Sequence, residues 1–338
     1  MKPLRSSFVT RRSFLAGASA LGATSLLGLP RVASAEPPPE ITRIRLNKAS
    51  LCTSPMYIAE ELLRAEGFSD VQYLEDDPRE IGTSKMVATG AVDLNMSFGM
   101  TTLLRVDAGE PVVMLAGVHA GCYELFGTED VRSIRDLRGR KVAIPGLGSS
   151  HHLYLSVVAS YVGLDPDQIS WVTMSREDAM RQLAEGKVDA YLGFPPDPQL
   201  LRAKGIGHVL LNSSTDQPWS QYFCCMVIAN RDFVRRYPVA TKRALRAMLK
   251  STDLCATQPG RSAQLLVEKG YVQSRDIALQ TLSDIQYRKW RDYSPEDSIR
   301  FFSLRLREVG LVKSTPQQLI AQGTDWRFLN ELNRELKV

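Results

Sequence analysis

Short apolar runs alternate with helix-like segments along most of the chain. In the first half, the pattern predicts strands at 41–46, 71–74, 94–98 and 112–118, and helices at 55–66, 84–89 and 101–107. The order restarts with predicted strands at 141–144, 169–174, 190–194 and 208–211, and helices at 149–162, 176–185 and 198–203. Strands that alternate with helices indicate parallel β-α-β units. The apolar runs 112–118 and 208–211 predict strands that are buried on both faces.

The last third of the chain has a different pattern. An extended apolar stretch at 219–229 is followed by predicted helices at 238–256, 262–269, 275–283, 295–309 and 316–321. No strands alternate with these helices. We therefore expect a helical cap packed on one lobe rather than a third sheet domain.

One short sequence occurs twice. Residues 88–98 read ATGAVDLNMSF and residues 184–194 read AEGKVDAYLGF, and both copies are soon followed by Leu-Leu-Arg. In each copy Gly ends a predicted helix, Val-Asp leads into a strand, and Phe lies at the carboxyl end of that strand. The repeat predicts two lobes with the same local architecture.

The first 35 residues have the features of an export signal. Arg11 and Arg12 form a twin-arginine pattern, an apolar run spans 14–29, and Ala33-Ser34-Ala35 is a small-x-small cleavage site. A membrane span needs about 20 strongly apolar residues, whereas this run is shorter and rich in Gly, Ala and Ser. We expect export by the twin-arginine route, with cleavage between Ala35 and Glu36.

Charge and cysteine content narrow the function classes. The whole net charge of +5 lies in the predicted signal, which has five basic residues and no acid: Lys2, Arg5, Arg11, Arg12 and Arg31. A neutral mature chain argues against nucleic acid or anionic membrane as a partner. The first cysteine is Cys52, so no lipid anchor is expected at the cleavage site. Five cysteines do not make a disulfide-dense scaffold.

Several short motifs occur in an order that resembles one family. They are Ser54-Pro55-x-Tyr57-x-Ala59, Gly90-x-Val92-Asp93, 136–144 (DLRGRKVAI), 148–151 (GSSH) and Gly186-x-Val188-Asp189. The mature chain resembles the periplasmic solute-binding proteins of the nitrate, sulfonate, taurine and pyrimidine-precursor group, the NMT1/THI5-like family of ABC transporters. The resemblance implies a two-lobed α/β fold of the type II periplasmic-binding-protein class. Each lobe would be a mostly parallel sheet flanked by helices, with a helical C-terminal region.

The resemblance also implies domain limits. One lobe would comprise 36–122 plus 224–338 and the other 123–223, joined by crossovers near 121–126 and 221–225. In the family the two crossovers lie side by side, which would bring Cys122 close to Cys224 and Cys225. Two alternatives stay open there, a disulfide from Cys122 to one of these two, or buried reduced thiols. Cys255 is expected in the core.

Ligands of open parallel sheets bind beyond the carboxyl ends of the strands. The candidate ligand-binding residues at these ends and at the second crossover are Cys52, Thr53, Tyr57, Phe98, Thr101, Ser149, Ser150, His151, Arg176, Phe194, Asp197 and Tyr222. Ser149 or Ser150 is expected to cap a helix whose free N–H groups favour an anionic or carbonyl oxygen. Thr101 and Asp197 are natural N-caps at equivalent places of the repeat. Arg176 would either pair with an acid in the cleft or remain solvated.

Other kinds of site are not expected. Residues 145–152 contain Gly-x-Gly, but His151 stands where a dinucleotide fingerprint has its third Gly. A metal is not expected, because His119, His151, His152, Cys122 and the pair Cys224-Cys225 lack recognised ligand spacing. Residues 194–198 read FPPDP, where the family often has Trp-Asp-Pro. The ligand therefore stays open among sulfonates, carboxylates or aromatic acids, and pyrimidines, and no cofactor is expected.

The resemblance implies a monomeric periplasmic receptor without enzyme activity. It would close on a small polar or anionic organic solute and deliver it to an inner-membrane ABC permease with a cytoplasmic ATPase. One alternative is an enzyme like the pyrimidine-precursor synthases, which carry three consecutive cysteines followed by Phe-Cys and bind iron. The nearest sequence here, FCCM at 223–226, lacks the third Cys and the Phe-Cys ending. A metal-dependent binder and a sensory module are further alternatives.

Overall fold

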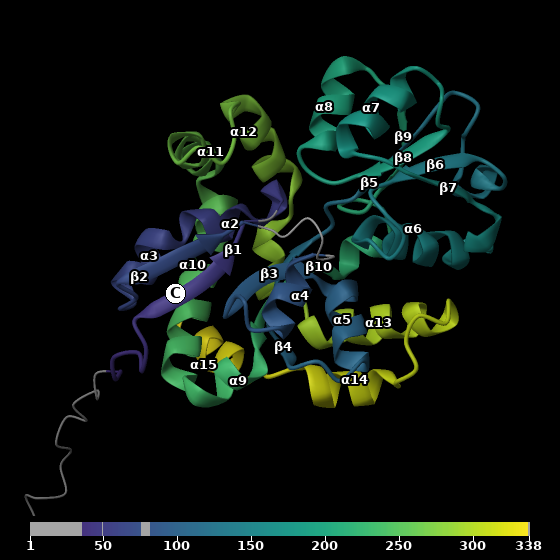
Figure 1. The fold of residues 1–338 in the computed structure, drawn as a ribbon. Helices are drawn as coiled ribbons and strands as arrows, with labels where there is room; N and C mark the ends of the chain where they lie inside the picture. Colours follow the sequence, from purple (N-terminus) through teal and green to yellow (C-terminus); the bar gives the residue numbers. More distant parts are fainter. Residues whose placement is uncertain (1–35, 49, 76–81, 337–338) are drawn as a thin grey trace, which may run out of the picture. The chain divides into compact units, whose positions relative to one another are not determined.

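The computed structural model describes residues 36–48, 50–75 and 82–336. The described residues from Pro38 onward form one compact unit (Figure 1). The expected signal peptide, including its cleavage after Ala35, lies outside the described residues. Among the described helices, none combines the length and the apolar character that a membrane span requires.

The strands of the described residues form three sheets (Figure 1). The first pairs β1 (Arg43–Asn47) with β2 (Asp70–Leu74). The second has β10 (Phe223–Asn230) between β3 (Leu94–Phe98) and β4 (Val112–Ala120). The third has the order β7-β6-β8-β5-β9, with β5 at Glu124–Gly127, β6 at Lys141–Ile144, β7 at Ser170–Thr173, β8 at Ala190–Gly193 and β9 at His208–Asn212.

Helices follow most strands, as the pattern predicts. Those between strands are α2 (Ser54–Ile58), α3 (Glu60–Ala65), α4 (Thr83–Ala88), α5 (Gly99–Asp107), α6 (Ser150–Tyr161), α7 (Arg176–Ala184) and α8 (Asp197–Lys204). The helix expected at 55–66 is divided at Ala59. Short 3-10 turns occur at Leu51–Thr53, Ile134–Leu137, Pro166–Gln168, Trp219–Gln221 and Tyr287–Arg291.

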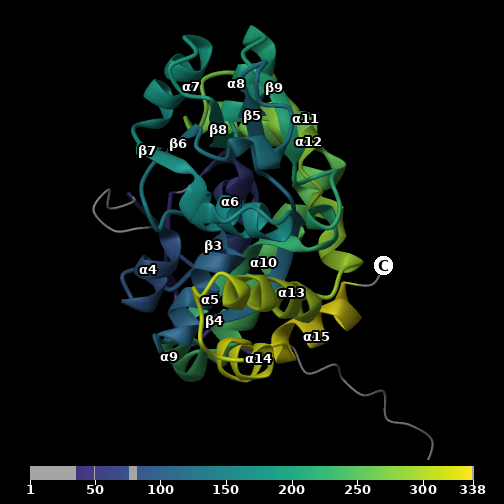
Figure 2. The same cartoon turned by 90° about the vertical axis from the view of Figure 1, so that its right-hand side faces the viewer.

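The last third of the chain is helical, as expected. Its helices are α9 (Arg231–Arg236), α10 (Pro238–Thr257), α11 (Pro259–Glu268), α12 (Arg275–Asp284), α13 (Pro295–Glu308), α14 (Pro316–Gly323) and α15 (Arg327–Glu335). The pattern did not indicate α9 or α15. Helices α14 and α15 contact β4, and α13 contacts α5 (Figure 2). Helix α12 also reaches α8, beside the five-stranded sheet.

Two strands run against the parallel framework. The pairs β1–β2, β6–β7 and β6–β8 are parallel, whereas β5 and β10 are antiparallel to their neighbours. Each of these two enters its sheet from the other sheet, because the chain crosses between Ala120 and Glu124 and returns between Asn212 and Phe223. The exact lobe limits at 122/123 and 223/224 stay a prediction.

Of the two apolar runs expected to be buried on both faces, only one is buried along its whole length. Strand β4 is buried at every position. Strand β9 is an edge strand in which His208 and Val209 are exposed, so this prediction was wrong for 208–211. A short apolar run does not show how many neighbours its strand will have, since that depends on the strand order.

The sequence repeat corresponds to a repeated backbone clamp. In the first copy, the Asp93 carboxylate accepts from Arg45 N at 2.8 Å, and the Asp93 N–H donates to Arg45 O at 2.9 Å. In the second copy, Asp189 makes the same two bonds with Lys141, at 2.7 and 2.8 Å. An arginine adds to each clamp, Arg45 to Asp93 at 2.6 Å and Arg140 to Asp189 at 3.1 Å. Each aspartate therefore fixes the start of its strand to a neighbouring strand.

The two clamps differ in burial, and we therefore expect them to contribute differently to stability. Asp93→Ala removes a nearly buried acceptor (side chain 9% exposed) and is expected to lower the free energy of unfolding by about 1–3 kcal/mol. Asp189→Ala acts on a more exposed pair (24% and 41%) and should cost less than about 1 kcal/mol. Urea unfolding of the two variants checks this order. Equal losses, or a larger loss for Asp189→Ala, would show that burial does not set the strength of the clamp.

Candidate functional site

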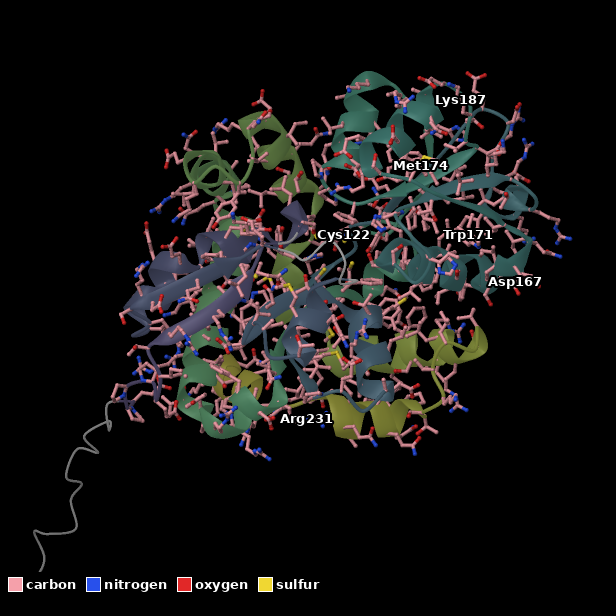
Figure 3. The ribbon with its side chains drawn as sticks, viewed as in Figure 1. Cys122, Asp167, Trp171, Met174, Lys187 and Arg231 are labelled. Carbon is pink, nitrogen blue, oxygen red and sulfur yellow. The ribbon has the colours of Figure 1, made fainter. Side chains whose placement is uncertain are left out.

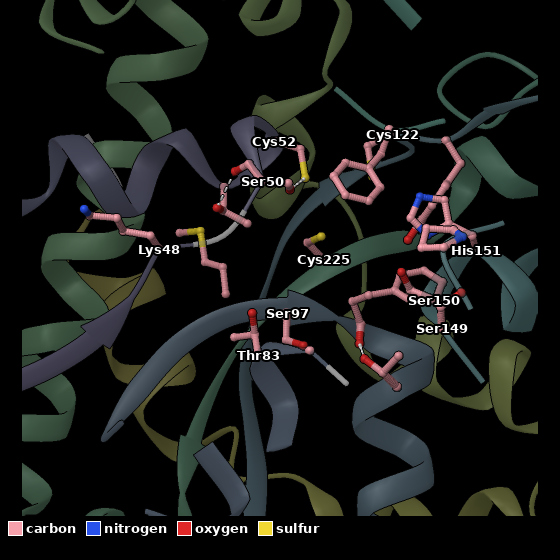
Figure 4. A pocket seen from close by; sticks show the side chains of 18 of the residues that line it. Lys48, Ser50, Cys52, Thr83, Ser97, Cys122, Ser149, Ser150, His151 and Cys225 are labelled. Carbon is pink, nitrogen blue, oxygen red and sulfur yellow. Dashed lines mark hydrogen bonds between the residues drawn. The ribbon is translucent and has the colours of Figure 1, made fainter. Parts of the chain in front are cut away.

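A cavity of about 570 Å³ lies where strand ends of the different sheets face one another (Figure 4). Most of the candidate ligand-binding residues line it, namely Cys52, Thr53, Phe98, Thr101, Ser149, Ser150, His151, Arg176 and Phe194. They come from the turn after β1, the end of β3, the start of α5, and the segments that follow β6, β7 and β8. Most of the residues predicted at the strand ends therefore line this cavity, as expected for open parallel sheets. Their roles in ligand binding stay predictions.

Three candidate residues lie elsewhere. Tyr57 is 2% exposed and stacks on Tyr271 at 4.2 Å, because α2 presents this face to α11 rather than to the cavity. Tyr222 stacks on Phe301 at 3.9 Å and lines a separate hollow. Asp197 is buried underneath Arg176 and does not line the cavity.

The first turn of α6 faces the cavity as expected. Ser149 caps the helix by accepting from His152 N at 3.3 Å. The N–H groups of Ser150 and His151 have no carbonyl partner in the helix, because the first turn of any helix lacks one. Gly148 precedes the cap with φ of 78°, a conformation that favours glycine. The cavity therefore has a set of backbone donors at one end of a helix dipole.

His151 and His152 have different surroundings. His152 accepts from Gly148 N and lies edge-on to Trp171 at 4.8 Å. His151 is 3% exposed, lies 4.8 Å from the Phe194 ring, and neither ring nitrogen has a hydrogen-bond partner. Burial, and then the charge of Arg176, lower its pKa to about 3. His151 is therefore a neutral imidazole that offers one donor and one acceptor beside the cavity.

An aromatic wall joins the two copies of the repeat. Phe98 and Phe194, the last residues of the two copies, lie 5.3 and 5.9 Å from the ring of Tyr123. Sequence reasoning missed Tyr123 as a site residue, although it lies in the first crossover. Its place between the two phenylalanines follows from the crossing of the chain between sheets.

The charged side chains at the cavity are neutralised within the protein. Arg176 donates to both carboxylate oxygens of Asp197, at 2.8 and 2.7 Å, and lies 4.4 Å above the Phe194 ring. Lys48 pairs with Glu75. Arg176 thus pairs with an acid of the protein that lies beneath the cavity wall, whereas the expected partner was an acid in the cleft.

The N-cap roles expected for Thr101 and Asp197 were wrong. Helix α5 begins at Gly99, so Phe98 is its N-cap and Thr101 donates to Phe98 O at 2.8 Å. Helix α8 begins at Asp197, with Pro196 as the N-cap, and the Asp197 carboxylate turns inward to Arg176. Helix α2 likewise begins at Ser54, one residue before the predicted helix at 55–66. Each helix starts earlier than the apolar period indicated.

Cysteines and a histidine form a further part of the wall. Cys52, Cys122 and Cys225 line the cavity, and with His119 they form a group whose potential ligand atoms all lie within 4.8 Å of one another. Hydrogen bonds from Cys122, Cys224 and Cys52 hold the pKa of the Cys225 thiol well below its usual value.

All five cysteines are free thiols, which is the second of the two expectations for Cys122. Its Sγ lies 3.0 Å from that of Cys224, and Cys255 is fully buried as expected. Spacing along the sequence did not indicate the group at Cys52, His119, Cys122 and Cys225, because its members are brought together by the crossing of the chain and the turn after β1.

Comparisons with known proteins identify the family of the chain. The family described as NMT1/THI5 like matches residues 53–262. The 4-amino-5-hydroxymethyl-2-methylpyrimidine phosphate synthase THI5 of Saccharomyces cerevisiae is 20% identical over 258 residues, 70% of this chain and 72% of that protein. The corresponding synthase of Candida albicans is 22% identical over 226 residues, 61% of this chain and 65% of that protein.

Solved structures of binding proteins share the fold. The periplasmic nitrate-binding protein NrtA from Synechocystis PCC 6803 has a TM-score of 0.73 at 16% identity, over 89% of this chain and 91% of that one. The alkanesulfonate-binding protein SsuA from Xanthomonas axonopodis pv. citri has a TM-score of 0.65 at 18% identity, over 85% and 99%. With its mixed α/β sheets and helical C-terminal region, the chain has the type II periplasmic-binding-protein fold and belongs to the NMT1/THI5-like family.

Proposed function

We propose that the protein is an exported receptor that binds a small polar or anionic organic solute and delivers it to an ABC importer. The observation that carries this proposal is the cavity of about 570 Å³ lined by residues from both sheets that the crossovers connect. Its volume suits a single small molecule. The ligand would stabilise the closed arrangement because it contacts both sides of the cavity at once.

The cavity wall favours a solute with a planar ring. Phe98, Tyr123 and Phe194 provide aromatic surface, and the neighbouring His151 provides two unpartnered ring nitrogens. Arg176 and Lys48 already have carboxylate partners, so the cavity does not demand a strongly charged ligand. The donors at the start of α6 suit one oxygen-bearing substituent. Aromatic acids, aromatic sulfonates and pyrimidines meet these requirements better than an inorganic anion does.

Export and delivery rest on the family and on the N-terminal sequence. The twin-arginine pattern and the Ala33-Ser34-Ala35 site direct the chain to the periplasm in this proposal. A structural neighbour named as the periplasmic nitrate-binding protein NrtA supports the same location. The partner would be an inner-membrane ABC permease with its cytoplasmic ATPase, which docks on the closed monomer.

An enzyme is the second candidate, because the relatives of known activity are pyrimidine phosphate synthases. The sequence FCCM at 223–226 lacks the longer cysteine run expected of them. One observation separates the two candidates. A ligand that is recovered chemically unchanged after prolonged incubation with the protein supports a receptor, and a ligand that is converted supports an enzyme.

A thermal-shift screen tests the ligand class. We expect aromatic acids, aromatic sulfonates or pyrimidines to raise the melting temperature, and their aliphatic counterparts to do so less at equal concentration. A ligand at 100 times its dissociation constant stabilises the folded state by about 2.7 kcal/mol, which is readily measured. A response to aliphatic sulfonates or nitrate alone would rule out the ring-binding wall but leave a receptor. No response to any class would remove the support for the proposal.

Two arginines of α7 provide a matched pair for the same screen. Arg176→Gln changes a guanidinium that lies on the cavity wall. It is expected to lower the affinity for the best ligand by about tenfold or more. Arg181→Gln changes an arginine that is 55% exposed and pairs with Asp178 and Glu185 of its own helix region, and it should leave affinity unchanged. Calorimetric titration of both variants checks this. Equal affinities would place the ligand away from Arg176.

His151→Phe tests the unpartnered imidazole. The ring remains to pack against Phe194 and Tyr123, but the donor and the acceptor are lost. We expect about tenfold weaker binding, the value of roughly one hydrogen bond, without a lower melting temperature of the free protein. Unchanged affinity would mean that the ligand does not use the His151 nitrogens.

A further inference from the structure

We propose that Cys52, His119, Cys122 and Cys225 form a tetrahedral site for one thiophilic metal ion, with Zn²⁺ as the expected occupant. The four potential ligand atoms lie within 4.8 Å of one another. In a tetrahedral Cys3His site with Zn–S bonds of about 2.3 Å, the sulfur atoms are about 3.8 Å apart. Closing the group around an ion therefore requires shifts of about 1 Å or less, which side-chain rotation supplies.

The fold brings these residues together from three separate segments. His119 of β4 and Cys225 of β10 are opposite each other in the antiparallel register. The register shifts on both sides of Cys225, an irregularity that commonly redirects a side chain next to a functional site. Cys122 follows in the crossover, and Cys52 lies in the turn Leu51–Thr53 after β1 (Figures 3 and 4). The four residues therefore come from separate parts of the chain and are not a run of cysteines that are consecutive in the sequence.

The orientation of His119 is the observation that points to an ion. Its side chain is fully buried, and Nδ1 lies 3.1 Å from Gly121 O. A carbonyl only accepts, so Nδ1 carries the proton and Nε2 is the free ligand atom. Nε2 is buried without a hydrogen-bond partner. Metal-bound histidines usually donate their other N–H to a carbonyl in this way.

A further contact supports one of the sulfur ligands. Ser50 Oγ lies 2.7 Å from Cys52 Sγ, where a hydroxyl can donate to a thiolate. The Tyr287 hydroxyl donates to Cys52 O at 2.8 Å and fixes the backbone of the turn. Both contacts hold Cys52 at the group, as outer partners of metal ligands do.

The choice of metal follows from the donor set. Three thiolates and one imidazole suit Zn²⁺, which prefers four tetrahedral ligands of this kind. Hard ions such as Mg²⁺ and Ca²⁺ prefer oxygen and are not expected to bind. With all four ligands supplied by the protein, the ion would connect the turn after β1 to the two crossing segments. Its first effect would therefore be on the stability of the cavity wall.

The test is metal reconstitution of the purified protein under anaerobic, reducing conditions. After removal of metal by a chelator, we expect one Zn²⁺ per chain by elemental analysis. Co²⁺ in its place should give the charge-transfer and ligand-field absorption of a tetrahedral thiolate site. X-ray absorption of the zinc form should show three sulfur and one nitrogen ligand at about 2.3 and 2.0–2.1 Å.

Matched variants make the assignment specific. Cys225→Ser and His119→Asn are expected to lower the affinity for Zn²⁺ by at least about 100-fold, since loss of an outer partner alone lowers metal affinity 10–100-fold. Cys224→Ser changes the neighbouring thiol, 3.0 Å from Cys122 and outside the group, and should keep full stoichiometry. Equal melting temperatures of all variants in chelator would exclude misfolding as the cause.

Two results would overturn the site. One is reduced wild-type protein that binds no Zn²⁺ or Co²⁺ in stoichiometric amount. The other is binding that survives both Cys225→Ser and His119→Asn. Neither result affects the proposed receptor function, because the solute screen can be carried out on protein kept in chelator.

Discussion

The two crossings of the chain between sheets are the constraint on which the rest of the structure depends. Because each crossing strand enters a sheet from the other side, β5 and β10 must run antiparallel to strands that otherwise form parallel units. The crossings place Cys122 and Tyr123 at the cavity wall and set His119 opposite Cys225. The same backbone that connects the sheets therefore supplies both the aromatic wall and the thiol group. The residues available for binding at this cavity therefore depend on where the chain crosses between the sheets.

Outside the crossings, one local device is used twice. A helix ends at a glycine with positive φ, and a Val-Asp pair leads into a strand whose aspartate binds the backbone of a neighbouring strand. The clamp fixes where each strand begins, so the phenylalanine at its far end arrives at the cavity in both copies. The repeated sequence thus positions the Phe98 and Phe194 rings of the cavity wall. The hydrogen bonds that do so lie at the start of each strand, and the rings lie at its end.

The likeness to binding proteins and to pyrimidine phosphate synthases shows how one fold serves different chemistry. At 20–22% identity, the sequence relation to the synthases carries the family but not the activity. What this chain itself provides is a cavity with neutralised charges, an uncharged imidazole and a buried thiol group. These features favour recognition of a polar ring and provide soft ligands for an ion.

The sequence by itself determined most of the order of strands and helices, the repeated Gly-x-Val-Asp unit and most of the strand-end residues of the cavity, because these follow from local periodicity and turn chemistry. It did not indicate β5, α9 or α15. It did not determine that 208–211 is an edge strand, that Asp197 turns inward to Arg176, or that Tyr57 packs against Tyr271. Those outcomes depend on which elements become neighbours. The group at Cys52, His119, Cys122 and Cys225 depends on this most strongly. Its members are separated by up to half the chain, and only the pairing of β4 with β10 and the position of the turn after β1 bring their side chains within bonding range of one ion.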